Sequence, residues 1–214
     1  MRKTLLGITR AILIGLVILS GAIAIPILFR PFYDWHITPL HLTDMVELTP
    51  EQIKTAYREM MNFCIGSTDT FSAGILPFSA SGADHFADVR KLFLLDLRVF
   101  AVTGILLIVI TAVLRKKKLR LLGHTPGFWS AVGLGVVFAV IGGLAALDFD
   151  RAFTVFHKLF FPGKDNWLFN PRTDPIINIL PAEFFRNCAI LILAVILLSC
   201  TGLLLRDWQI RRKK

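Results

Sequence analysis

Two histidines in this sequence lie among acidic and aromatic residues, a setting in which an imidazole can move protons. His85 lies between Asp84 and Asp88, and His157 directly follows Phe156. The ordinary pKa of histidine is close to neutrality, so an imidazole can take a proton and return it at physiological pH. A carboxylate at Asp84 or Asp88 would fix the tautomer of a nearby imidazole. These residues therefore predict general acid–base chemistry.

The remaining motifs narrow the possible chemistry. His36 and His41 lie five residues apart beside a proline, which fits helical metal-ligand spacing poorly, and His124 adjoins a Pro-Gly turn. The chain contains no GxSxG, HExxH or CxxC pattern and no phosphate-binding loop. We therefore expect no metal, nucleotide or flavin cofactor.

The composition predicts a membrane protein. Of the 214 residues, 55% are apolar and only 18% are charged, and the mean hydropathy is +0.65. Four apolar runs, at 8–29, 93–114, 128–147 and 184–205, are each long enough to cross a bilayer as a helix. We expect one integral membrane domain over residues 1–214. A cleaved signal peptide is the alternative for the first run, but this run extends to Phe29, which is long for a signal core.

The basic residues predict the orientation of these spans. Thirteen of the 24 Lys and Arg residues lie in the first ten residues, between the second and third spans, or after the fourth span. This pattern places both termini in the cytoplasm and the segments 30–92 and 148–183 on the extracytoplasmic face. The net charge of +9 is thereby explained by topology, and no nucleic-acid partner is expected.

The two outer segments are too long to be simple connections and are expected to form a cap. Thr49-Pro-Glu-Gln52 is a capping pattern that predicts a helix. Ser81-Gly-Ala-Asp84 is a second such pattern, and a helix that began there and continued into the second span would place His85 and Asp88 on one face. We expect an all-α membrane protein with four transmembrane helices, whose cap is either helical or includes a small sheet.

Several segments together resemble a known family. They are His85-Phe-Ala-Asp88-Val-Arg-Lys, Phe156-His157-Lys-Leu-Phe-Phe, Asp165-Asn-Trp167, Asp174, and Leu-Pro181-Ala-Glu183-Phe-Phe. In these segments and in its four-span layout, the chain resembles the lipoprotein intramolecular transacylases of low-GC Gram-positive bacteria.

The resemblance implies an activity, a partner and a site. The partner would be a diacylated lipoprotein in the cell membrane, whose sn-2 acyl chain moves from the S-diacylglyceryl group to the cysteine α-amine and leaves a lyso form. His85 would be the base and His157 the acid or oxyanion partner, or the reverse. Supporting carboxylates would be Asp84, Asp88, Asp174 and Glu183, and the lipid pocket would contain Phe156, Phe160, Phe161 and Trp167.

Two other functions remain open from the sequence. A haem or metal protein would use His85 and His157 as ligands, and its preparations would be coloured or would contain stoichiometric metal. A non-enzymatic scaffold or transporter subunit would tolerate replacement of both histidines. A transporter usually shows internal repeats and broken helices, which the sequence does not suggest.

Overall fold

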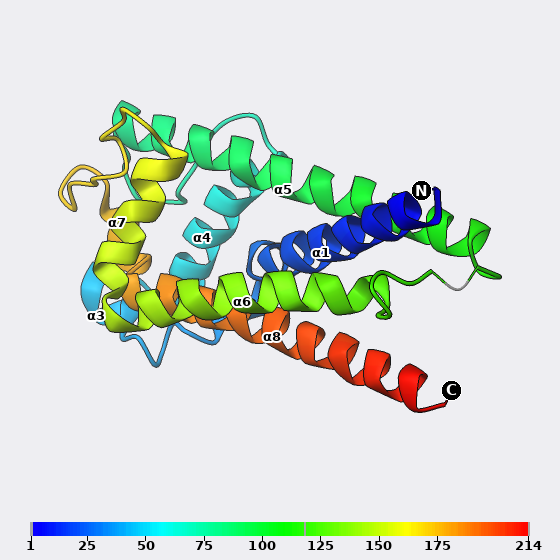
Figure 1. The fold of residues 1–214 in the computed structure, drawn as a ribbon. Coiled ribbons are helices and arrows are strands. Elements are labelled where there is room, and N and C mark those ends of the chain that lie inside the picture. The colour runs from blue at the N-terminus through cyan, green and yellow to red at the C-terminus, as the bar shows by residue number, and fades with distance from the viewer. Residues whose placement is uncertain (1, 118, 214) are drawn as a thin grey trace. The chain divides into compact units, whose positions relative to one another are not determined.

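The described part of the chain is helical. The computed structural model describes residues 2–117 and 119–213, so Lys118 and Lys214, two of the basic residues used above, lie outside it. Apart from one isolated bridge between Leu121 and His124, these residues form no β-structure. The elements (Figure 1) are α1 (Arg2–Leu28), α2 (Pro31–Asp34), α3 (Leu42–Val46), α4 (Pro50–Cys64), α5 (Ala80–Val113), α6 (Pro126–Leu147), α7 (Phe149–Phe160), η1 (Pro175–Ile179) and α8 (Ala182–Arg212).

Four helices are long and apolar enough to cross a membrane, namely α1, α5, α6 and α8. Large aliphatic side chains on all four remain exposed, such as Ile12, Ile108, Leu144 and Leu198. Exposed apolar surface of this extent is unfavourable in water and favourable against lipid tails. The expected all-α membrane fold with four spans is confirmed, and its outer segments are helical.

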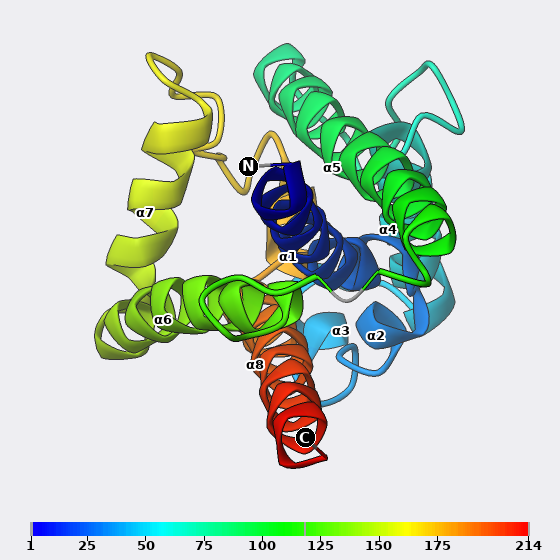
Figure 2. The ribbon, with the colours of Figure 1, turned by 45° about the vertical axis from the view of Figure 1, so that its right-hand side comes forward.

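The chain divides into two compact units. Unit 1 comprises residues 1–24, 96–143 and 190–214, and unit 2 comprises residues 25–95 and 144–189. In unit 1, α1 lies among α5, α6 and α8 (Figure 2). Its buried core contains the small residues Ala22, Ala131 and Cys200 together with Ile196. Small side chains allow helix backbones to approach closely, which is how helices associate where no hydrophobic force acts between them.

The basic segments meet at one end of unit 1. The Oγ of Ser130, near the start of α6, donates to the backbone carbonyl of Ala11 in α1 at 2.5 Å. Gly7 packs against Leu121 of the loop between α5 and α6, and Asp207 near the end of α8 accepts a hydrogen bond from Thr125 N. The start of α1, this loop and the end of α8 therefore lie together.

Unit 2 is built around α4. As predicted, Thr49 caps this helix: its Oγ1 accepts from Gln52 N, and the Gln52 side chain accepts from Thr49 N. One face of α4 is buried, and Tyr57 on that face stacks on Tyr33 with 3.6 Å between ring centroids. The Tyr33 hydroxyl donates to the carbonyl of Ile179 in η1, which ties the two outer segments together.

The second predicted cap was wrong by two residues. Helix α5 begins at Ala80, so Ser81 and Asp84 lie inside its first turns. The Oγ of Ser79 accepts from Gly82 N at 3.0 Å, so Ser79 is the N-capping residue that the sequence predicted at Ser81. The helix then continues without interruption to Val113, as expected.

Candidate functional site

The candidate site lies wholly in unit 2, and α7 supplies one half of it. Asp148 caps this helix by accepting from Arg151 N at 2.9 Å. One face of α7 is apolar and exposed, with Phe156, Leu159 and Phe160. His157 is on the opposite, buried face. An amphipathic helix of this kind lies flat at a lipid–water boundary and directs its other face into the protein.

The structure brings His85 and His157 together. Their ring centroids are 5.8 Å apart and their planes differ by 30°. Trp167 stacks on His157, with 4.7 Å between the two ring centroids. Phe161 and Phe169 present their edges to His85 at 5.0 and 5.4 Å. Both imidazoles are buried within this aromatic enclosure, from which water is largely excluded.

The backbone determines the tautomer of His157. Its Nδ1 lies 2.8 Å from the carbonyl oxygen of Phe153, which can only accept, so Nδ1 carries the proton and donates. Burial lowers the pKa of His157 below its ordinary value, although the bond to Phe153 opposes this effect. The imidazole is therefore neutral near pH 7, and its Nε2 carries a free lone pair.

His85 differs from His157 in its hydrogen bonding. Its Nδ1 is buried and finds no partner among the described residues. An unsatisfied buried polar atom costs free energy, and at a functional site it is a group reserved for a ligand. Two imidazoles this close in a dry setting also disfavour a charge on both of them.

Asp88 organises the polar side of the site. Its carboxylate accepts from Lys91 at 3.0 Å, from Asn166 at 3.4 Å and from Lys164 in a short ion pair. Within the described chain, neither imidazole is among its hydrogen-bond partners. Asp88 therefore anchors the 164–166 turn beside His85, whereas the sequence suggested that it would orient a histidine directly.

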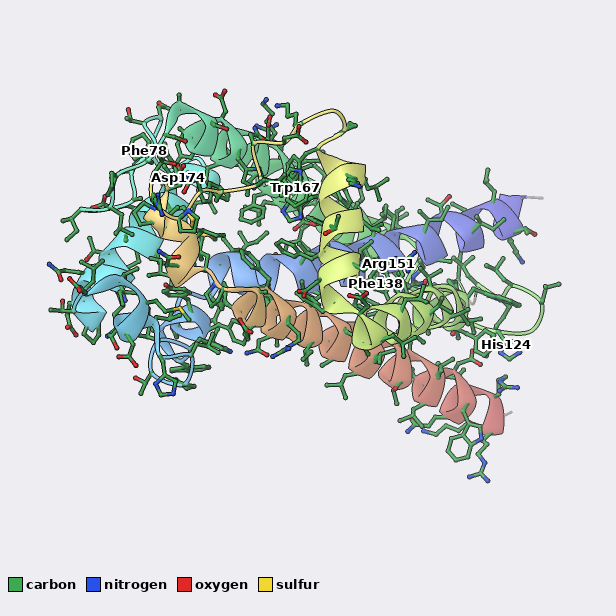
Figure 3. All side chains as sticks on the ribbon, turned by 90° about the vertical axis from the view of Figure 1, so that its left-hand side faces the viewer. Phe78, His124, Phe138, Arg151, Trp167 and Asp174 are labelled. Carbon is green, nitrogen blue, oxygen red and sulfur yellow. The ribbon has the colours of Figure 1, made fainter. Side chains whose placement is uncertain are left out.

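Asp174 anchors the start of α5, which positions His85. Its buried carboxylate accepts from Ser79 N and from the Thr173 hydroxyl, each at 2.7 Å. Burial raises the pKa of Asp174, but these hydrogen bonds outweigh burial and leave the pKa below its ordinary value. A Cβ on Gly82 would lie 2.2 Å from Oδ1 of Asp174, so only glycine fits there. Figure 3 shows Asp174 close to Phe78, which lies just before the start of α5.

Not every predicted residue joins this cluster. Asp84 and Glu183 are exposed, on α5 and in the first turn of α8. Phe160 lies on the exposed face of α7. Phe156 is also exposed, but its ring pairs with His157 at 5.4 Å, and Phe161 and Trp167 contact the imidazoles from the buried side. Trp167 lies close to the end of α7 (Figure 3).

Sequence reasoning missed Lys164, Asn166, Phe169 and Ser79. The first three belong to one turn, Gly163-Lys-Asp-Asn-Trp-Leu-Phe169, of which only the tryptophan was selected. A lysine and an asparagine beside a tryptophan in an otherwise aromatic segment were the available signal. Ser79 gave no signal of its own, since its role depends on Asp174.

Comparisons with known proteins agree with this arrangement. The family described as lipoprotein intramolecular transacylase Lit matches residues 8–185. A solved structure of the membrane-integral lipoprotein intramolecular transacylase Lit from Bacillus cereus superimposes with a TM-score of 0.88 at 25% identity, covering 100% of this chain and 99% of that chain.

Two further structures of the Bacillus cereus protein carry histidine mutations, H85R and H85A in its own numbering. They match with TM-scores of 0.81 and 0.80, at 26% and 25% identity. They cover 99% and 100% of this chain, and 93% and 96% of their own. No protein of curated function matches the chain. The family match over most of the chain and the shared fold lead to one assignment: this protein belongs to the lipoprotein intramolecular transacylase family and is an acyltransferase.

Proposed function

We propose that this protein moves the sn-2 acyl chain of an S-diacylglyceryl cysteine to the α-amine of the same cysteine. The carbonyl carbon forms a new bond to the amine nitrogen, and its bond to the glyceryl oxygen breaks. The amine loses a proton and the glyceryl oxygen gains one, so the lyso product is an isomer of the substrate. The observation that carries the proposal is the pair of buried imidazoles 5.8 Å apart at an apolar, aromatic site.

Positioning supplies much of the catalysis. The direct shift closes a ring of about eight atoms, which a mobile lipid rarely forms, so holding amine and ester together lowers the barrier. No acyl donor or nucleotide is needed, because an ester becomes the more stable amide. The rings of Trp167 and Phe161 keep water away from the reacting carbonyl. This exclusion matters because attack by water would hydrolyse the ester.

We assign the role of base to His157 and the role of acid to His85. The sequence had left this assignment and its reverse open. A free α-amine has a pKa of about 8, so part of it is protonated at neutral pH and a base is useful. The Nε2 lone pair of His157 can accept the proton of the amine, because Nδ1 donates to the carbonyl of Phe153. His85, whose Nδ1 has no protein partner, stabilises the developing oxyanion and protonates the leaving alkoxide. It regains a proton from the protonated His157, so both imidazoles return to the neutral form.

We further propose that the site is on the extracytoplasmic face of the cell membrane. Supporting this orientation, the basic segments gather at one end of unit 1, as the cytoplasmic end of a membrane protein does. In the sequence, one apolar run separates each basic segment from the segments 30–92 and 148–183, which carry the histidine pair. A mature lipoprotein presents its lipidated cysteine on that side.

The proposal is tested by co-expression with a diacylated lipoprotein in a host that lacks this activity. Because the shift is an isomerisation, the mass of the N-terminal lipopeptide stays the same, and fragment spectra must locate one acyl chain on the amine. Two lipoproteins with different acyl chains, mixed in one reaction, should yield no crossed product. Crossed products would show transfer between molecules and contradict the intramolecular step.

The matched control for a His157→Ala variant is His36→Gln. His36 also lies in unit 2, contacts a backbone carbonyl four residues earlier through Nδ1 and packs beside Phe184. We expect the amide-linked product to disappear with His157→Ala and to persist with His36→Gln. Undiminished product with His157→Ala would remove this residue from the mechanism.

A further inference from the structure

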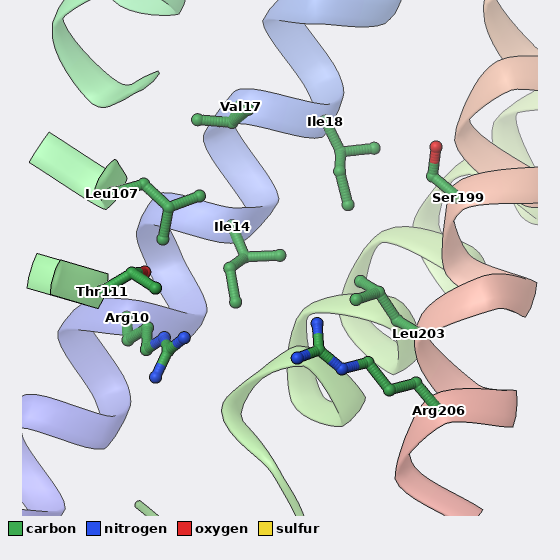
Figure 4. A pocket seen from close by; sticks show the side chains of 9 residues that line it. All are labelled: Arg10, Ile14, Val17, Ile18, Leu107, Thr111, Ser199, Leu203 and Arg206. Atoms are coloured by element: carbon green, nitrogen blue, oxygen red, sulfur yellow. The ribbon is translucent and has the colours of Figure 1, made fainter. Parts of the chain in front are cut away.

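A cavity in unit 1 is separate from the histidine site. It has a volume of about 430 Å³ and lies between α1, α5 and α8 (Figure 4). Its wall is largely aliphatic and includes Ile14, Ile18, Leu107 and Leu203. The volume is within the range of small-molecule sites, so the cavity has room for part of a lipid.

Two arginines give this cavity a charged side. Arg10 of α1 and Arg206 of α8 both extend into the space between these helices, with the aliphatic side chains beyond them (Figure 4). Within the described chain, neither forms an ion pair with a carboxylate. By contrast, Arg120 and Arg211 at the same end of unit 1 approach Asp207 at 3.8 and 3.0 Å. The cavity therefore has two cationic groups without an anion.

The surroundings determine what can fill such a cavity. Water gains little between aliphatic walls within a bilayer, whereas an acyl chain matches them. A guanidinium group binds a phosphate through paired N–H donors, and basic pockets between membrane helices bind anionic lipid headgroups in this way. A zwitterionic lipid has a cationic group that two nearby arginines would repel.

We propose that this cavity binds one anionic phospholipid, with its phosphate on Arg10 and Arg206 and an acyl chain against Ile14, Ile18, Leu107 and Leu203. The lipid is a bound component of unit 1, distinct from the lipoprotein substrate in unit 2. Because it contacts three helices at once, it links α1 to α5 and α8 and stabilises the unit by mass action.

The test measures lipid retention by the full-length protein in detergent, using native mass spectrometry. Phosphatidylglycerol and phosphatidylcholine with the same acyl chains are added at equal concentration. We expect phosphatidylglycerol to be retained on the order of thirtyfold better, since each basic residue near an anionic group contributes roughly fivefold. An Arg10→Gln, Arg206→Gln double variant should lose this preference.

The matched control is an Arg115→Gln, Lys116→Gln double variant, which removes the same charge from exposed positions outside the cavity. It should keep the preference, and a loss there would show a general charge effect and overturn the proposal. A Ser199→Phe variant fills the cavity without changing charge and should also reduce retention; unchanged retention would overturn the acyl-chain placement. Displacement of the lipid by equimolar glycerol phosphate would show a phosphate-ion site and no lipid site.

Discussion

Both units contain histidines in contact with buried groups, but the two settings differ: His124 in unit 1 is only partly buried, whereas His85 and His157 in unit 2 are buried. In unit 1, His124 Nδ1 lies 2.9 Å from Asp207, and this fully buried carboxylate also accepts from Thr125 N and Arg211. In unit 2, by contrast, His85 leaves a buried nitrogen without a partner and His157 keeps a free lone pair. A histidine bonded to a buried carboxylate that several other groups share holds a fold together, whereas a buried histidine nitrogen without a protein partner is available to a substrate.

The strongest test of this contrast exchanges each histidine for glutamine. His85→Gln should reduce N-acyl product formation at least about 100-fold, because it removes a proton-transfer group, while the melting temperature changes little. His124→Gln should do the opposite and lower the melting temperature while the folded protein keeps its activity. Product is measured from fragment spectra and stability from thermal unfolding in detergent. Equal activity losses in both variants would contradict the division into a reactive and a structural histidine.

The next test removes the charge at the centre of the structural cluster. Asp207→Asn should cost roughly 2–3 kcal/mol, since hydrogen bonds to a buried charged group contribute about that much. The free energy of unfolding in mixed micelles measures the loss. Glu183→Gln, an exposed carboxylate on the same helix α8, is the control and should cost little. An Asp207→Asn variant with an unchanged free energy of unfolding would show that the cluster is not structural.

The features predictable from the sequence were those set by neighbouring residues. The four spans and the Thr49 cap depend on local pattern, and both are confirmed. The cap of α5 was misplaced because Asp174, 95 residues further on, binds the backbone of Ser79. Likewise the Asp88–Lys164 pair spans 76 residues and the His124–Asp207 contact spans 83, and no local pattern indicates such contacts.

The third test concerns the support behind the reactive pair. Gly82→Ala places a methyl group 2.2 Å from Asp174 Oδ1, so the start of α5 must shift. We expect a loss of about 1–3 kcal/mol and a several-fold decrease in product, because His85 is one turn further along. Gly104→Ala, on the same helix with nothing within 4 Å of the new methyl, should be neutral or slightly stabilising. Equal effects at both glycines would rule out a specific role for the Asp174 contact.

The smallest expected effect is a spectroscopic one at His157. Because burial lowers its pKa, the ring should be neutral at and above neutral pH, with the proton on Nδ1. Nitrogen chemical shifts of labelled histidine distinguish this tautomer from the Nε2–H form and from the imidazolium. Spectra of the His157→Gln variant identify the signal. An Nε2–H tautomer would transfer the role of base to His85.

The same lowered pKa makes stability depend on pH in a defined direction. Between the folded-state pKa and about 6.5, the unfolded chain binds more protons at this position than the folded one does. The stability associated with a neutral His157 is therefore fully present above pH 6.5 and is lost as the pH falls through this window. His157→Gln should reduce the slope of the melting-temperature curve in this window. Part of the slope should remain, because burial also lowers the pKa of His85, to about 4. The difference between the curves of the unchanged protein and the variant isolates the share of the pH dependence that belongs to His157.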